Sequence, residues 1–119
     1  MSRAVKLSTG VFAALGILAI AIGLVLALSN RPATANEMLS LGEQYLLEMR
    51  FEQALEQFMG VIDAEPYNPR AYVGAAVAYE GLRQRASAID ILRIGYERTG
   101  SIWIAARRAE IDPLFWVMN

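Results

Sequence analysis

Residues 41–58 read LGEQYLLEMRFEQALEQF, and residues 75–92, which lie 34 positions later, read AAVAYEGLRQRASAIDIL. The two stretches share the order of small, aromatic and large aliphatic side chains. The matched pairs are Gly42 with Ala76, Tyr45 with Tyr79, Ala54 with Ala88, Leu55 with Ile89 and Phe58 with Leu92. Self-similarity at a fixed spacing of this length indicates a repeated supersecondary unit.

Helix breaks divide each stretch into a hairpin. Turn signals stand at Met49–Phe51 and Gly81–Arg85, and the segment from Glu65 to Pro69 separates the two units. Asn68 is suited to an N-cap and Pro69 to the first position of a helix. Small residues between the helices allow close approach, while Tyr45, Tyr79, Phe58 and Leu92 fill the remaining space. We therefore predict an all-α fold of two antiparallel hairpins.

The motifs also resemble a known family. Leu41-Gly42-x-x-Tyr45, Ala54-x-x-x-Phe58 and Pro66, then Ala75-Ala76-x-x-Tyr79 and Ala88-x-x-x-Leu92, resemble two consecutive tetratricopeptide repeats over about residues 36–100. The sequence departs from the family pattern at Met38, where an aromatic residue is common, and at Gly100, where proline is common. The resemblance implies a short solenoid whose first helices line a concave surface that accepts peptides or partner helices.

A third unit begins after Gly100. Ser101 is suited to cap a helix whose Ile102, Ala105, Ala106 and Ala109 share one face, and we expect this helix to seal the stack. The apolar tail contains Leu114, Phe115 and Trp116. It either folds back over the last hairpin or inserts into a neighbouring molecule. Residues 37–119 are therefore predicted to form one repeat domain of two hairpins and a capping segment.

Residues 1–30 form a separate segment. Val11–Leu28 contains neither a charged nor a strongly polar side chain and is long enough, as a helix, to cross a bilayer. Arg3 and Lys6 precede it, so the positive-inside rule places the N-terminus in the cytoplasm and the domain outside. The alternative is a secretory signal cleaved after Ala35, since residues 33–35 read Ala-Thr-Ala. Both interpretations export the domain.

Small side chains recur every four residues in the apolar segment, at Ala19, Gly23 and Ala27. They form a face that a second transmembrane helix could approach closely, although alanine and glycine are common in all such segments. Residues 31–36 are predicted to be a short linker. Asn36 is expected to cap the first helix of the domain, with Glu37 in its first turn.

One face of the first helices is a candidate binding surface. Apolar side chains on this face are flanked by charged ones, as in grooves that accept an amphipathic or extended segment. The alternative is that a closely wound stack buries the same side chains. The predicted groove consists of Leu39, Glu43, Leu46, Leu47, Arg70, Val73, Val77 and Glu80.

Composition limits the chemistry. The chain has neither cysteine nor histidine, which removes thiolate nucleophiles and the commonest general base and metal ligand. The acidic pairs fall on solvated helix faces without a nucleophile, so we expect no catalytic site, metal or cofactor. Arg3 and Lys6 are two of the 11 basic residues, and the remaining nine face 12 acidic ones, so nucleic acid is not an expected partner.

These observations predict a protein that acts by contact. The expected function is a membrane-anchored scaffold or accessory subunit that docks a protein segment within a larger membrane complex. The alternative is a secreted or periplasmic peptide-binding module released by signal cleavage. Self-association through the apolar tail would instead give a homo-oligomer.

Overall fold

The computed structural model describes residues 2–118, which contain seven helices and no strand. Two compact units divide after Pro32, the first holding α1 and the second holding the remaining helices. The all-helical class predicted from the sequence is therefore confirmed for the described residues. The helices are α1 (Ser2–Ser29), α2 (Ala35–Leu47), α3 (Phe51–Ala64), α4 (Pro69–Gly81), α5 (Arg85–Thr99), α6 (Ile102–Ile111) and α7 (Phe115–Met118).

Helix α1 contains the apolar N-terminal segment. Its residues 10–29 all expose their side chains, and this stretch has a mean hydropathy of 2.9. A helix of 20 such residues is long and apolar enough to cross a bilayer, and a secretory signal sequence has the same properties. The N-terminal apolar helix is thus present as predicted, and both interpretations of it remain open.

Helix α2 starts earlier than predicted. The Thr34 hydroxyl accepts a hydrogen bond from the Glu37 N–H at 3.2 Å, and the Glu37 carboxylate accepts one from the Thr34 N–H at 3.0 Å. This reciprocal pair is a capping box, which satisfies two free N–H groups at once. The prediction of Asn36 as the cap is therefore wrong, because Thr34 stands three residues before Glu37 and Asn36 does not.

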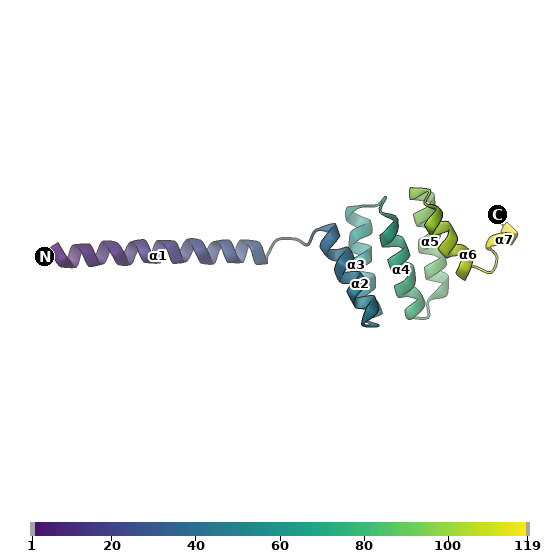
Figure 1. Cartoon of the computed structure of the whole chain (residues 1–119), viewed down its shortest axis with the longest axis horizontal. Helices are drawn as coiled ribbons and strands as arrows, with labels where there is room; N and C mark the ends of the chain where they lie inside the picture. The colour runs from purple at the N-terminus through teal and green to yellow at the C-terminus, as the bar shows by residue number, and fades with distance from the viewer. Residues whose placement is uncertain (1, 119) are drawn as a thin grey trace. The chain divides into compact units, whose positions relative to one another are not determined.

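The second unit is a row of helices in alternating directions. Each helix from α2 to α6 packs against the next one in the chain, and α4 also contacts α2 and α6 (Figure 1). The helices are joined by short turns, which favours antiparallel neighbours. As a result α2, α4 and α6 lie next to one another along one side of the domain.

Phe58 lies at the centre of the core, only 1% exposed. Its ring meets the backbone of α2 at Gly42 and that of α4 at Gly74. A Cβ added at Gly42 would lie 2.9 Å from a ring carbon, and one added at Gly74 would lie closer still. Two bare backbone positions therefore form the slot that holds the ring. Ala54, Ala76, Ala88 and Leu92 are fully buried, whereas Tyr45 and Tyr79 are only partly buried.

Tyr72 is the second large aromatic side chain of the core. It is fully buried on α4, and its ring lies against Gly95 of α5. Its hydroxyl donates to the Pro66 carbonyl oxygen at 2.6 Å and accepts a hydrogen bond from Arg98 Nη1 at 3.1 Å. Tyr72 therefore buries its ring while its polar end stays bonded, and it joins α4 to the loop before it and to α5.

The turns within the two hairpins have the same backbone geometry. The Arg50 N–H donates to the Tyr45 carbonyl and the Gln84 N–H to the Tyr79 carbonyl, each at 2.8 Å. The residues before these donors, Met49 and Arg83, have φ of 57° and 61°. The hydrogen bonds are those of a helix that ends in a left-handed residue. The 34-residue spacing seen in the sequence thus recurs in backbone conformation.

Helix α6 packs through a face other than the predicted one. Ile104 and Ile111 are buried, whereas Ile102 is 72% exposed and Ala106 is also exposed. Helix α6 therefore packs on α5 and α4, but the predicted face is not the one that makes this contact, since Ile102 and Ala106 are exposed and Ala105 and Ala109 are only partly buried. The face of α6 that packs against the domain includes Arg107 and Arg108. These two charged side chains can be partly buried because a carboxylate pairs with each guanidinium group.

The tail forms a short helix beside α6. The Arg108 guanidinium lies 5.5 Å from the centre of the Phe115 ring, and Trp116 meets that ring edge-on at 5.1 Å. Phe115 is partly buried, while Leu114, Trp116 and Val117 remain exposed. The tail therefore folds back only through Phe115 and leaves most of its apolar surface open.

Substitution at Gly74 tests the Phe58 slot. Gly74→Ala should lower the free energy of unfolding by about 1–3 kcal/mol, because a rigid ring and the α4 backbone both resist the added methyl group. Gly60→Ala is the matched control. Its new methyl group would meet only the flexible end of Met38, and alanine favours a helix by about 1 kcal/mol over glycine. Urea unfolding followed by circular dichroism should separate the two; equal midpoints would contradict this packing.

Glycine at the left-handed turn positions should stabilise the domain. Met49→Gly and Arg83→Gly should each add about 1 kcal/mol, since a side chain in this conformation carries a steric cost that glycine lacks. Both side chains are exposed, so little packing is lost. Arg50→Gly and Gln84→Gly, one residue later at negative φ, should be neutral or destabilising. Thermal melting of the four variants checks the expectation, which fails if Met49→Gly lowers the melting temperature.

Candidate partner groove

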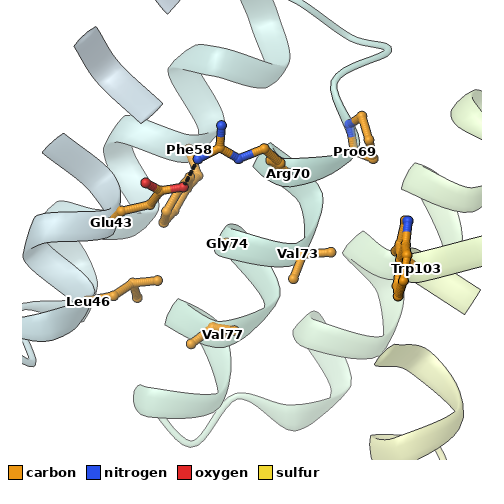
Figure 2. Close-up of a pocket in the computed structure, with 9 residues that line it drawn as sticks. All are labelled: Glu43, Leu46, Phe58, Pro69, Arg70, Val73, Gly74, Val77 and Trp103. Carbon is orange, nitrogen blue, oxygen red and sulfur yellow. Dashed lines mark hydrogen bonds and ion pairs between the residues drawn. The ribbon is translucent and has the colours of Figure 1, made fainter. Parts of the chain in front are cut away.

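A groove runs along the side of the domain formed by α2, α4 and the start of α6. Its volume is about 400 Å³. Figure 2 shows side chains from these helices around it, with Phe58 of α3 behind them. We call this surface the partner groove; it is lined by Glu43, Leu46, Phe58, Pro69, Arg70, Val73, Gly74, Val77 and Trp103.

The interior of the partner groove is apolar. Leu46 on α2 and Val73 and Val77 on α4 form its walls, one helical turn apart on α4. Gly74 has no side chain, which leaves the edge of the Phe58 ring as part of the lining. The same glycine that accommodates the core ring therefore also deepens the surface above it.

Trp103 forms the end of the groove at the first turn of α6. Its side chain is 75% exposed, although tryptophan is among the residues that gain most from burial. An exposed indole beside an apolar hollow is a common feature of protein-binding sites. Trp103 is thus the strongest candidate for an anchor residue in this groove.

An ion pair lies on the rim. Arg70 Nη2 of α4 and Glu43 Oε1 of α2 are 2.5 Å apart, with both side chains largely exposed. Exposed pairs contribute about 0–1 kcal/mol to stability, so this pair adds little to the fold. Each charge neutralises the other, which leaves the groove itself apolar, as Figure 2 shows.

The structure brings together five of the eight residues predicted for the groove, namely Glu43, Leu46, Arg70, Val73 and Val77. Leu39 is 4% exposed and belongs to the core, because it lies on the face of α2 that packs against the neighbouring helices. Leu47 is 88% exposed outside the groove, at the last residue of α2. Assigning these two residues to the groove is therefore wrong.

Glu80, the eighth predicted residue, has a different role. It forms an ion pair with Arg107 and joins α4 to α6, away from the partner groove. Burial lowers the pKa of Arg107, but hydrogen bonds to Glu110 and Glu80 outweigh this effect and the pKa is raised overall. Arg107 therefore keeps its charge, and the pair holds the last long helix to the hairpin before it.

Sequence reasoning missed Trp103, Pro69, Phe58 and Gly74 as lining residues. Trp103 stands 34 positions after Pro69, and both lie at the start of helices on this side of the domain. Extending the repeat register into α6 was the signal that could have found it. Phe58 and Gly74 could not be found this way, because both are buried and Phe58 reaches the lining only where Gly74 lacks a side chain.

The other predicted contact residues lie outside the groove. Ala19, Gly23 and Ala27 are exposed along α1. Leu114, Phe115 and Trp116 belong to the tail beside α6. Among the described residues, no group of three or more side chains is arranged to hold a metal ion.

Comparisons of the chain with protein-family models, curated proteins and solved structures gave no match. The partner groove and the apolar helix α1 are therefore the features on which a function can be argued.

Proposed function

We propose that this protein is a membrane-anchored interaction scaffold that holds an apolar segment of a partner protein in the partner groove. The observation that carries the proposal is the groove itself, an open apolar surface with an exposed tryptophan at its end. Surfaces of this kind on soluble domains mark protein contacts. A role as an accessory or assembly subunit of a membrane complex follows from joining this domain to an anchor.

We propose a tetratricopeptide-like arrangement for the domain. The repeated hairpin turns 34 residues apart support it, as do small residues between the helices and the position of the groove on the first helix of each pair. In that arrangement the groove is the inner surface of the stack. A partner segment as long as about two helical turns, either an amphipathic helix or an extended strand, would cover Val73, Val77 and Trp103 together.

The anchor interpretation is supported by the start of α2. Cleavage after Ala35 would remove Thr34, whose capping box begins the helix, and Ala35, which packs against the core. Loss of such a cap costs about 1 kcal/mol. A mature domain beginning at Asn36 would therefore start with a damaged first helix. By the positive-inside rule, Arg3 and Lys6 support an orientation with the N-terminus in the cytoplasm and the domain on the opposite side.

Partner capture tests the groove. A photo-cross-linking amino acid at Trp103 in the full chain should form a covalent adduct with a protein in native membranes. Val77→Glu should abolish this adduct, because it puts a charge on the groove wall, whereas Leu47→Glu should leave it unchanged. Leu47 is the matched control, since it is apolar and exposed but lies off the groove. An adduct that survives Val77→Glu, or no adduct at all, would refute the groove as the docking site.

The mature mass tests the anchor. The chain isolated from membranes should retain residues 1–35 by intact mass spectrometry and should resist extraction with alkaline carbonate. A soluble chain beginning at Asn36 would instead establish the alternative, a secreted or periplasmic binding module. The two results are exclusive, because α1 lies wholly in the segment that cleavage would remove.

A further inference from the structure

Three helices of the domain begin at the same end. Because the helices from α2 to α6 alternate in direction, the starts of α2, α4 and α6 lie at one end, together with the turns at residues 65–68 and 100–101 (Figure 1). The linker from α1 also enters the domain here, at Thr34. We call this the linker end. The opposite end carries the turns at residues 48–50 and 82–84.

Exposed aromatic and aliphatic side chains gather at the linker end. Tyr67 lies in the turn before α4, and Ile102 and Trp103 lie in the first turn of α6; all three are strongly exposed. Tyr96, near the end of α5, is exposed as well. In the described part of the domain, the only other exposed aromatic residue is Trp116 of the tail. Tyrosine and tryptophan are the residues that are enriched where a protein meets the headgroups of a bilayer.

The linker is too short to hold this end far from a membrane. Only residues 30–34 separate α1 from α2, and an extended segment of this length reaches at most about 18 Å. The apolar stretch of α1 ends at Ser29, and the headgroups on each side of the hydrocarbon core occupy about 5–8 Å. This limit follows from chain length alone and holds for any angle between α1 and the domain. With α1 as an anchor, the lipid surface is therefore within reach of the linker end.

We propose that the linker end of the domain rests on the bilayer that holds α1, with the side chains of Tyr67 and Ile102 inserted among the lipid headgroups. Apolar surface leaves water there, while the tyrosine hydroxyl keeps hydrogen bonds to headgroups or water. The tether raises the effective concentration of the lipid surface, so that a contact too weak to hold a free domain is sufficient. The proposal rests on the anchor in the proposed function and does not depend on the partner groove.

The contact is apolar rather than electrostatic. Glu65 lines a hollow together with Tyr67, and the charge of Arg98 lies close to the same tyrosine. Arg70 at the start of α4 is already paired with Glu43. Anionic lipid is selected by clusters of basic residues, and the linker end instead mixes both signs. The proposed ligand is therefore the zwitterionic phospholipid surface.

Tryptophan fluorescence in the full chain tests the proposal. The sequence has two tryptophans, so Trp116→Phe leaves Trp103, the neighbour of Ile102, as the only one. In phosphatidylcholine vesicles, the emission of this variant should be quenched by lipid that carries a nitroxide on the upper part of its acyl chain. The matched control combines Trp103→Phe and Trp116→Phe with Leu47→Trp. It should show little quenching, because the length of α2 puts Leu47 about 20 Å from the linker end.

Charged substitutions separate insertion from stability. In the variant with Trp103 alone, Tyr67→Asp together with Ile102→Asp should abolish the quenching, because a carboxylate resists transfer out of water. Both replaced side chains are exposed, and aspartate in the first turn of α6 is favoured by the helix dipole. Circular dichroism should therefore be unchanged. Tyr67→Phe with Ile102→Leu should keep the quenching, and so should Leu47→Asp at the opposite end.

Flotation of the same vesicles separates this inference from the proposed function. A chain that floats with the vesicles while Trp103 escapes quenching would overturn the inference and leave the anchor standing. A chain that does not float would refute the anchor and the inference with it. Val77→Glu, which disables the partner groove, should leave the quenching unchanged. Quenching that survives the double aspartate variant, or that requires anionic lipid, would also overturn the proposed contact.

Discussion

The domain depends on the contact between the Phe58 ring and the bare backbone at Gly42 and Gly74. A ring from α3 lies between α2 and α4, so one side chain sets the distance between the two hairpins. Packed interiors resist both added and removed volume. The contact therefore fixes the spacing of the helices and, with it, the width of the partner groove.

The same contact links the core to the binding surface. Gly74 makes room for Phe58 on one side and leaves a hollow on the other, where Val73 and Val77 form the walls. A larger residue at position 74 would displace the Phe58 ring, which is itself part of the groove lining. Stability and the shape of the partner groove are thus coupled at one residue, while the ion pair of Glu43 with Arg70 at the rim contributes little to stability.

The partner groove depends on α6 as well as on the two hairpins. The partner groove is lined mainly by residues of α2 and α4, and its exposed Trp103 belongs to the first turn of α6.

The sequence by itself determined the helical class, the apolar N-terminal segment and most of the hairpin core. The spacing of 34 residues correctly predicted that Gly42, Ala54, Phe58 and Ala88 are buried in the core. Small residues at the matched positions let the helices approach, and the large residues fill the space between them. Backbone breaks at Pro66 and Pro69 are local properties. Such features follow from residue type and near neighbours alone.

Only the tertiary structure decided which helix faces are open. Leu39 and Leu47 look alike in sequence, yet one is buried and the other exposed, since the rotation of α2 depends on what packs against it. On α6 the arginine-bearing face packs inward, because Glu80 of α4 pairs with Arg107, and Asp112 at the C-terminal end of α6 itself pairs with Arg108. Trp103 reaches the groove only when α6 lies beside α4. Burial and pairing are properties of several elements together, so no single stretch of sequence encodes them.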